Sequence, residues 1–271
     1  MSKLIAIFNQ KGGVGKTTTN INLATCLATN KKRVLVIDID PQGNTTSGLG
    51  IEKNKLDNTI YELLTDEKVD AKDVIIPTGI KNMDIIPSNV ELAGAELELS
   101  AQYGREKRLK NALASVEEDY DYVLVDCPPS LGLLTINTLT AVDSVLIPIQ
   151  CEFYALEGVS QLMSTIDLVK KNLNEDLKIE GVVLSMFDNR TKLSAEVQNE
   201  VRKYFKGLLY DTVIPRNVRL AEAPSHGIPI VHYDPSSAGA KAYKKFAKEN
   251  EFGLETVKDV YEALLKDRRD P

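Results

Sequence analysis

The sequence predicts an α/β protein with a doubly wound, mostly parallel sheet and helices on both faces of that sheet. Short apolar runs recur along the chain, and each run is continuous rather than alternating. Continuous runs are typical of strands that are covered on both faces. The segments between the runs have the apolar spacing of helices. Strands that alternate with helices form right-handed crossovers, which produce parallel sheets.

The individual elements follow in chain order from this alternation. The apolar runs predict strands over residues 4–8, 34–37, 83–86, 122–125, 144–149 and 181–186. Helices are expected between and after them, over residues 16–30, 89–117, 132–141, 156–174, 193–206, 237–249 and 254–267. Segment 74–87 contains two short apolar stretches joined through Thr78-Gly79, which predicts a small hairpin-like excursion.

The domain organisation is expected to be simple. The chain contains no linker rich in Ser, Gly or Pro, no internal repeat and no block of like charge. Its 271 residues are within the range of a single α/β domain. We therefore expect one domain over residues 1–271, with the helices of about 237–267 packed on its core.

The composition is that of a globular, cytoplasmic protein, with 43% apolar residues, 27% charged residues and a formal net charge of −6. No apolar run has membrane length, and the run at 4–8 is too short for a secretory leader. Cys26, Cys127 and Cys151 are odd in number and lack CxxC spacing, which predicts reduced thiols without a disulfide or structural metal. The net negative charge argues against constitutive binding to nucleic acid.

A phosphate-binding loop is the motif that says most about function. The first strand runs into Gln10-Lys-Gly-Gly-Val-Gly-Lys-Thr-Thr18, and a helix-compatible stretch follows. Glycines let backbone N–H groups turn inward around phosphate oxygens, and the helix N-terminus adds positive potential. Lys16 can reach the β- and γ-phosphates, and the Thr17 hydroxyl can ligate Mg²⁺. The predicted nucleotide-binding set in this loop is Lys11, Gly12, Gly13, Val14, Gly15, Lys16, Thr17 and Thr18.

The loop departs from the usual pattern GxxxxGK[ST]. Gln10 stands where that pattern has a glycine, and Lys11 is an additional lysine. A dinucleotide fingerprint through Gly13 and Gly15 would need a glycine at the position of Thr18, which excludes that fold. The alternative is a strand–helix turn that binds no ligand, and the convergence of glycines, lysines and threonines argues against it.

Aspartates follow two of the predicted strands. Asp38 and Asp40 follow the strand at 34–37, and Asp126 ends the strand at 122–125. The carboxyl ends of parallel strands open onto the same crevice, so these carboxylates are expected near the phosphate loop. Asp126 matches an aspartate that holds Mg²⁺ through water, and Asp38 is a weaker candidate for the metal. The alternative for each is an aspartate that caps the next turn.

The motifs together resemble a known family. The stretches 11–18, 38–42 and 126–129 resemble the deviant Walker A ATPases, which have the P-loop NTPase fold. Segments 153–158, 187–190, 214–217 and 220–229 look like those of the short ParA/Soj-type chromosome and plasmid partitioning ATPases. The resemblance extends from Met1 to about residue 250.

The resemblance implies an ATP-dependent sandwich homodimer. Lys11 of one protomer would reach the phosphates held by the other, which makes Lys11 and Lys16 catalytic together with Asp40. Asp40 would position or activate the attacking water. Gly12 would stay free of a side chain so that two loops can approach closely. Two further residues, Pro215 and Asn217, would lie near the adenine edge.

The resemblance also implies partners. ATP hydrolysis would be slow alone and stimulated by a ParB-type centromere-binding protein. The ATP-bound dimer would bind double-stranded DNA without sequence preference, which makes the cytoplasmic protein nucleoid-associated. Its output would be the segregation of chromosome or plasmid copies.

A basic segment supplies candidate DNA contacts in spite of the acidic total. Residues 190–219 contain seven basic and three acidic side chains, a local +4 that leaves −10 for the remainder. Such a segment suits contact with the phosphate backbone and predicts a steep salt dependence. Arg190 and Arg219 match the DNA-contacting positions of the family, and a solvated helix face is the alternative for several others. The full candidate set is Arg190, Arg202, Lys203, Lys206, Arg216 and Arg219.

Three other functions are alternatives to this one. A MinD-like membrane switch would use an apolar stripe in segment 254–265, but interspersed acidic residues favour packing on the core, so no membrane is expected. Segment 54–57 matches a guanine-binding signature but precedes the strand at 122–125, whereas GTPases have it afterwards. A nitrogenase-reductase-like electron carrier would need bridging cysteine ligands, which the scattered thiols do not supply.

Overall fold

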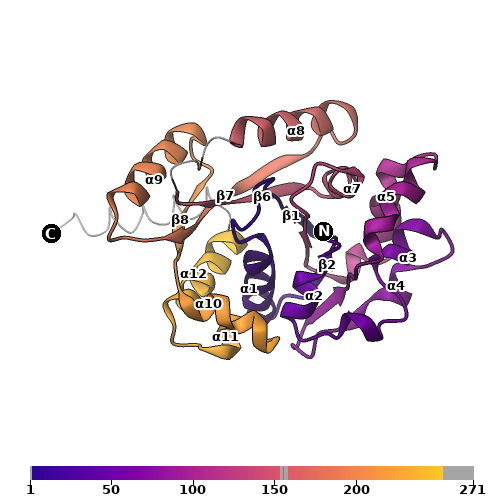
Figure 1. Cartoon of the computed structure of the whole chain (residues 1–271), viewed down its shortest axis with the longest axis horizontal. Coiled ribbons are helices and arrows are strands. Elements are labelled where there is room, and N and C mark those ends of the chain that lie inside the picture. Colours follow the sequence, from indigo (N-terminus) through magenta and orange to yellow (C-terminus); the bar gives the residue numbers. More distant parts are fainter. Residues whose placement is uncertain (1, 153–154, 156–157, 253–271) are drawn as a thin grey trace.

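One eight-stranded sheet organises the molecule. The computed structural model describes residues 2–152, 155 and 158–252. The strand order is β3-β4-β2-β5-β1-β6-β7-β8, and every neighbouring pair is parallel except β3 with β4. Helices lie on both sides of the sheet (Figure 1). The predicted doubly wound, mostly parallel fold is therefore confirmed.

The six predicted strands are all present. They are β1 (Lys3–Ile7), β2 (Val34–Asp38), β4 (Met83–Ile86), β5 (Tyr122–Asp126), β6 (Ser144–Gln150) and β7 (Lys178–Phe187). A further strand, β8 (Leu209–Pro215), was not expected from the sequence. It is an edge strand, and the exposed Asp211 interrupts its apolar residues, so it lacks the continuous run that marks a central strand.

The hairpin-like excursion is confirmed in its essentials. The short strand β3 (Ile76–Pro77) pairs antiparallel with β4, with Ile76 opposite Ile85. Residue Val74, however, ends the short helix α4 (Ala71–Val74) instead of extending the hairpin. Pro77 is tolerated because β3 is at the edge of the sheet, where a missing N–H donor leaves no neighbour unpaired.

Most long helices lie where the sequence predicts them. They are α1 (Lys16–Thr29), α7 (Leu133–Ala141), α8 (Val159–Asn172), α9 (Lys192–Tyr204) and α12 (Ala238–Phe252). The prediction of one helix over 89–117 is wrong, because the chain forms α5 (Leu92–Ser100) and α6 (Arg108–Leu113) instead. Gly104, with φ of 66°, separates them through a left-handed residue that a helix cannot accommodate. The expected helix over 254–267 lies outside the described residues.

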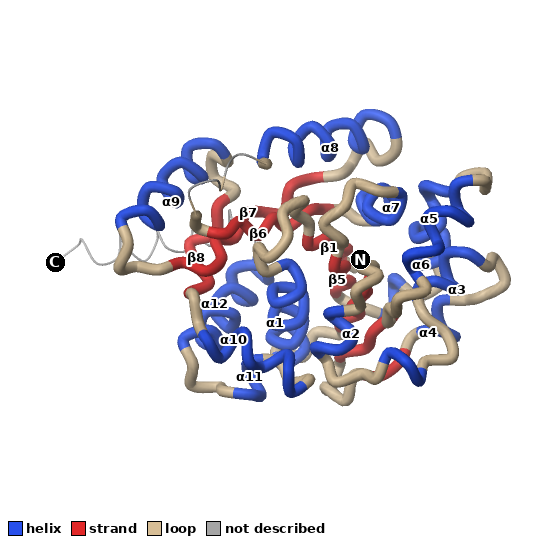
Figure 2. Tube along the Cα trace, in the orientation of Figure 1, coloured by secondary structure: helices blue, strands red, loops and turns tan. Residues whose placement is uncertain are grey.

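Several short helices were not anticipated. They are α2 (Asn44–Gly48), α3 (Ile60–Thr65), α10 (Val218–Glu222) and α11 (Ile230–Tyr233), with single 3₁₀ turns at Lys53–Lys55, Arg105–Lys107, Glu117–Asp119 and Ala223–His226. Segments of one or two turns are too short to show a helical period in the sequence. Figure 2 shows α2, α10 and α11 on the same side of the sheet as α1 and α12.

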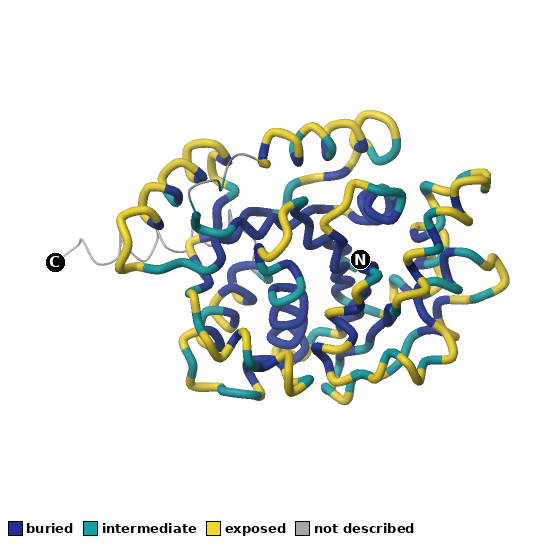
Figure 3. The backbone as a smooth tube through the Cα atoms, in the orientation of Figure 1, coloured by how far each residue is buried: buried dark blue, intermediate teal, exposed yellow. Residues whose placement is uncertain are grey.

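The apolar core is divided by the sheet into two layers. Leu4, Ala6 and Phe8 pack with side chains from α3 and α5–α9, whereas Ile5 and Ile7 pack with those from α1 and α12. Alternate residues of β1 thus enter opposite layers, as the two-residue period of a strand requires. In Figure 3 the central strands are buried along their length, which explains their continuous apolar sequences.

The register of the central strands positions the polar residues at one edge. Asp38 at the end of β2 is directly opposite Asp126 at the end of β5. Ile7, the last residue of β1, is opposite the same Asp126. The phosphate loop begins just after β1, so the two carboxylates and the loop meet at the carboxyl edge of three adjacent strands.

Candidate functional site

The phosphate loop joins β1 to α1 in a conformation that needs glycine at two positions. Gly13 and Gly15 have φ values of 75° and 90°, in the left-handed region that side chains disfavour. Gly12 differs, because its φ is not positive and a Cβ built there would meet no atom within 4 Å. Nothing inside the described protomer therefore requires glycine at position 12, and any such requirement comes from a ligand or a second molecule.

Side chains from neighbouring strands hold the loop in place. Asn9 donates from Nδ2 to the Pro148 carbonyl at 2.8 Å and accepts from the Lys11 N–H at 3.0 Å. Ser185 of β7 donates from Oγ to the Val14 carbonyl at 2.7 Å. Neither Asn9 nor Ser185 was singled out from the sequence, because their roles depend on strands that are far apart along the chain.

Lys16 is buried at the start of α1. Its Nζ donates to the Lys11 carbonyl at 3.2 Å, so the ammonium lies over the loop that precedes it. Burial lowers the pKa of Lys16, and the negative charges of Asp126 and Asp40 oppose that shift. A cation in such a place is stabilised by an anion, because an anion compensates the lost hydration.

Two hydroxyl groups fix the orientation of the Asp126 carboxylate. Thr17 Oγ1 and Thr45 Oγ1 both donate to Asp126 Oδ2, at 2.7 and 2.8 Å. The other oxygen, Oδ1, is buried and accepts no hydrogen bond within the described residues. Burial, then the charge of Asp38, raises the pKa of Asp126, while the two hydroxyl groups lower it. A buried acceptor without a donor indicates a missing partner such as a metal-bound water.

Both carboxylate oxygens of Asp38 accept hydrogen bonds from nearby residues of the chain. Its Oδ2 accepts from the Thr46 N–H at 2.8 Å and from the Thr46 hydroxyl at 2.7 Å. Its Oδ1 accepts from the Asp40 N–H at 3.3 Å. Burial raises the pKa of Asp38, and the Thr46 donors oppose the shift. These contacts fix the start of α2 and agree with the capping alternative, and Asp38 stays the weaker candidate for the metal.

Asp40 has one oxygen in use and one available. Its Oδ1 accepts from the Gln42 N–H at 2.9 Å, while its backbone carbonyl accepts from Ser88 Oγ at 2.9 Å. No described residue donates to Asp40 Oδ2. The side chain is nearly buried at the carboxyl edge of the sheet, and its free oxygen can accept a hydrogen bond from a water or ligand.

A cavity of about 370 Å³ opens beside the loop. Gly15 and Thr18 form one wall, and Pro215 and Asn217 at the end of β8 form another. Asn217 Oδ1 accepts from the Leu220 N–H at 3.3 Å and so caps α10. The other lining residues are Ser185, Met186, Ile214, Arg216, Val218, Leu220, Ala221 and Tyr243. The cavity has the mostly apolar wall and few polar groups of a site for a planar ring.

Lys11 is on the outer side of the loop, away from this cavity. Its side chain is half exposed, and its ammonium forms an ion pair with Glu152. The predicted contact of Lys11 with the phosphates of a second protomer would require that pair to open. Segment 54–57, with its guanine-like signature, contributes nothing to the cavity beside the loop.

The candidate DNA residues all lie on the exposed surface near α9, β8 and α10. Arg190 follows β7, and Arg202 and Lys203 are in the last turn of α9. Lys206 follows that helix, and Arg216 and Arg219 flank the start of α10. Arg190 and Arg219 are both engaged in ion pairs with carboxylates outside the segment 190–219.

Features that would indicate other chemistry are absent from the described part of the chain. All three cysteines are free, and burial raises the pKa of Cys26 and Cys151 to about 12. No group of His, Cys, Asp and Glu side chains that could hold a metal by itself was found among the described residues. Within the same residues, no helix has the length and apolar character needed to cross a membrane.

Comparisons with known proteins agree with this geometry. Residues 2–179 match the family model described as an AAA domain. The chain is 61% identical over 249 residues to the sporulation initiation inhibitor protein Soj of Bacillus subtilis (strain 168), with 92% of this chain and 98% of the relative covered. It is 52% identical over 249 residues to the chromosome partitioning protein ParA of Myxococcus xanthus (strain DK1622), with 92% and 88% covered.

A solved structure extends the comparison to three dimensions. The chain is similar to the structure described as cobyrinic acid a,c-diamide synthase from Mycobacterium smegmatis with bound ADP and magnesium. The TM-score is 0.82 at 38% identity, and the match covers 93% of this chain and 95% of that chain.

Proposed function

Because this chain belongs to the ParA/Soj family of P-loop ATPases, we propose that it hydrolyses ATP to segregate chromosome or plasmid copies. The observation that carries the ATPase part is the arrangement at Asp126. Two hydroxyl groups occupy one carboxylate oxygen, and the buried second oxygen is left for a water-bound metal. The partitioning role rests on the two relatives, which are more similar in sequence than the neighbour described as a synthase.

The residues present fit ATP and Mg²⁺. Hard oxygen donors are the ligands that Mg²⁺ prefers, and Thr17 and Asp126 supply them directly and through water. Lys16 and the loop N–H groups would bind the β- and γ-phosphates, since the buried ammonium has no carboxylate hydrogen-bonded to it in the described residues. When bound, Mg²⁺ would neutralise charge on the phosphates. The cavity at Pro215 and Asn217 would receive the base.

Each predicted catalytic residue has a distinct task in this proposal. Asp40, through its free oxygen, would accept a hydrogen bond from the attacking water and orient it toward the γ-phosphate. Lys16 would stabilise the negative charge that develops on the transferred group. Lys11 would leave Glu152 and contribute the same stabilisation to a second protomer.

The remaining parts of the proposal concern assembly. ATP would drive a sandwich dimer, and Gly12, which the fold itself does not require, supports a close approach of two loops. The dimer would bind double-stranded DNA without sequence preference, which would make the protein nucleoid-associated. Hydrolysis would be slow alone and stimulated by a ParB-type protein. We also propose that residues 1–271 form a single domain, because one sheet joins elements from 3 to 215 and α12 packs on it.

Two variants test the site assignment. Lys16→Ala should abolish ATP binding, because no other described ammonium is buried in the loop, and equilibrium binding of a fluorescent ATP analogue measures this. Asp40→Ala should keep ATP binding but reduce phosphate release by about 100-fold or more, since general-base or water-positioning groups contribute that much. Wild-type affinity in the first variant, or undiminished phosphate release in the second, would refute the assigned role.

A further inference from the structure

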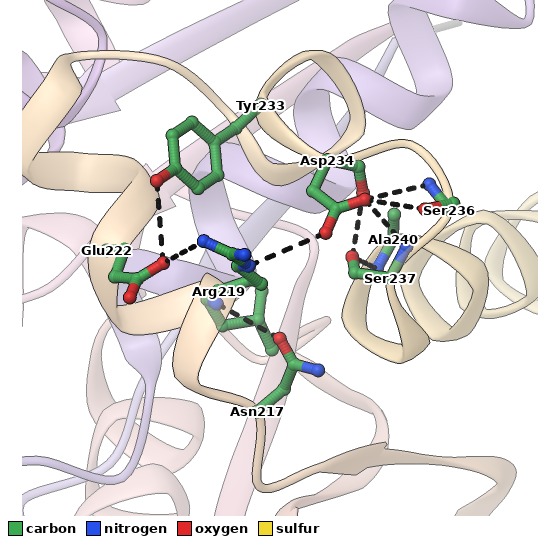
Figure 4. Close-up of polar contacts among 9 residues, drawn as sticks. Asn217, Arg219, Glu222, Tyr233, Asp234, Ser236, Ser237 and Ala240 are labelled. Atoms are coloured by element: carbon green, nitrogen blue, oxygen red, sulfur yellow. Dashed lines mark hydrogen bonds and ion pairs between the residues drawn. The ribbon is translucent and has the colours of Figure 1, made fainter.

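Arg219 is held between two carboxylates from different parts of the chain (Figure 4). Its NH1 group donates to Glu222 Oε2 at 2.8 Å, one turn further along α10. Its Nε is 3.7 Å from Asp234 Oδ2, in the loop between α11 and α12. The Arg219 side chain is 55% exposed, so a large anion can still reach it from solvent.

The two carboxylates differ in how firmly they are held. Asp234 Oδ1 accepts from the Ser236 and Ser237 N–H groups and from Ser236 Oγ, at 3.2, 3.1 and 2.8 Å. These contacts fix Asp234 in the turn that precedes α12. Glu222 has one further contact, a hydrogen bond of 3.4 Å from the Tyr233 hydroxyl. Glu222 is therefore the partner that can leave Arg219, while Asp234 keeps the guanidinium in place.

We propose that Glu222 sets the affinity for DNA by competing with a backbone phosphate for Arg219. This inference rests on the proposed DNA binding and adds the group that limits it. A phosphate and a carboxylate both accept from the donor edge of a guanidinium, and their like charges disfavour the binding of both at once. Binding of DNA then includes the cost of breaking the Arg219–Glu222 pair and of bringing phosphate near a displaced carboxylate.

Arg190, the other arginine expected to contact DNA, is also paired with a carboxylate, here a single one. Arg190 donates from Nε to Asp188 Oδ1 at 2.9 Å and from NH2 to Asp188 Oδ2 at 2.6 Å. These hydrogen bonds lower the pKa of Asp188 to about 2, so the competing charge persists at neutral pH. By contrast, Arg202, Lys206 and Arg216 form no ion pair within the described residues.

These contacts show that the charge of segment 190–219 alone overstates the positive charge around Arg190 and Arg219. The +4 of segment 190–219 omits Asp188, Glu222 and Asp234, which lie just outside it. Those three carboxylates face the two arginines that were expected to contact DNA. The surface is thus less positive than the segment alone suggests, and DNA binding is held to a moderate strength that a small change can alter.

The test compares Glu222→Gln with a matched control. Glu52→Gln changes the net charge equally and also removes an exposed pair spaced by three residues, Glu52–Lys55 at 2.7 Å. Affinity for a fluorescein-labelled duplex of random sequence is measured by anisotropy with ATP and Mg²⁺, over a series of salt concentrations. We expect Glu222→Gln to bind about two- to fivefold more tightly, the range that exposed ion pairs contribute, and Glu52→Gln to match the wild type.

A double-mutant cycle assigns the effect to Arg219. In an Arg219→Ala background, Glu222→Gln should strengthen binding clearly less, because no guanidinium remains to be released and only the repulsion between Glu222 and phosphate is removed. Asp188→Asn should independently strengthen binding through Arg190. Weaker or unchanged binding by Glu222→Gln, or an equal gain in the Arg219→Ala background, would overturn the inference while leaving DNA binding intact. A wild-type protein that binds no DNA with ATP would instead refute the proposed function, and the inference with it.

Discussion

At the scale of single residues, two hydroxyl groups determine which oxygen of the Asp126 carboxylate stays available to the proposed metal. Thr17 and Thr45 both donate to one oxygen, and this choice leaves the other oxygen for a different partner. Thr17 belongs to the phosphate loop, whereas Thr45 belongs to α2, which follows β2. The orientation of one carboxylate therefore depends on two strand ends at once.

Replacing Thr45 should weaken the metal site without unfolding the protein. Thr45→Val removes one donor to Asp126 but nearly keeps the side-chain volume, so the carboxylate can rotate. Metal affinity of the nucleotide complex should fall by about tenfold, the lower end of what outer-shell partners contribute. Titration of Mg²⁺ against fluorescent ATP analogue binding measures this, and Thr45→Ser should restore the wild-type midpoint.

The neighbouring threonine provides the matched control. Thr46→Val removes a donor from Asp38, which holds α2, so it should lower the free energy of unfolding and leave the Mg²⁺ midpoint unchanged. An unchanged midpoint in Thr45→Val, or an equal shift in Thr46→Val, would show that Thr45 does not orient the metal-site carboxylate.

At the scale of elements, α12 is attached to the edge of the sheet by buried polar groups as well as by apolar packing. Glu249 accepts from the Thr212 N–H at 3.0 Å and from Thr212 Oγ1 at 2.6 Å. Asn250 donates to the Tyr210 hydroxyl at 2.9 Å. Thr212 and Tyr210 both belong to β8, which is at the edge of the described sheet. Side chains of α12 therefore supply hydrogen-bond partners to this edge strand.

Loss of the Glu249 carboxylate should therefore destabilise the fold. Glu249→Leu leaves the buried N–H and hydroxyl of Thr212 without acceptors, which costs about 1–3 kcal/mol for such groups. Urea unfolding followed by circular dichroism measures the free energy of unfolding. The control, Lys245→Met, removes only the exposed partner of Glu249 and should cost less than about 1 kcal/mol. Equal effects of the two variants would contradict the assigned role of the carboxylate.

Sequence patterns predicted the elements that are long and buried, and they missed those defined by tertiary contacts. Continuous apolar runs identified the central strands, because both faces of such strands are covered. Strand β8 was not predicted, because it is an edge strand that pairs with β7 in the described sheet and its Asp211 faces solvent. It therefore lacks a continuous apolar run. The helix expected over 89–117 is broken at Gly104, which has a left-handed conformation. The glycine itself is the strongest sign of this break in the sequence.

In the candidate site, too, the residues in local sequence patterns were predictable, and those that depend on tertiary contacts were not. The spacing of the loop identified Lys16 and Thr17, and strand ends identified Asp126, because these positions follow local patterns. Thr45 follows Asp40 by five residues and is a hydroxyl in a polar segment, which is a weak signal without the register of β2 and β5. The pairing of Arg219 with Asp234 depends on how α10 packs beside α12, so a count of charges along the chain could not reveal it.

At the scale of the whole molecule, ATP-dependent dimerisation would connect three properties of the chain. The chain has a net charge of −6, the candidate DNA-contacting side chains lie near α9, β8 and α10, and the phosphate loop leaves open space at Gly12. Dimerisation on ATP would bring two basic surfaces together on one particle. Two weak phosphate-binding surfaces that act together bind DNA far more tightly than one, because the second contact becomes intramolecular.

Gly12→Val provides the variant that separates folding from assembly. The φ of Gly12 is compatible with a side chain and a Cβ there meets no atom within 4 Å, so the protomer should fold with wild-type stability. The added side chain should block the close approach of two loops. ATP binding that persists without dimerisation is the expected result, and a stable Gly12→Val dimer would contradict the proposed packing of the loops.

Sedimentation velocity with and without ATP, for the wild type and for Gly12→Val, measures whether ATP drives dimerisation and whether the dimer binds DNA. Wild-type protein with Mg²⁺ should sediment as a monomer alone and as a dimer with ATP. When duplex DNA is added, the dimer should move with the DNA boundary. Gly12→Val should remain a monomer and leave the DNA boundary unshifted. A wild-type protein that stays monomeric at saturating ATP, or that shifts the DNA boundary equally without ATP, would contradict the account.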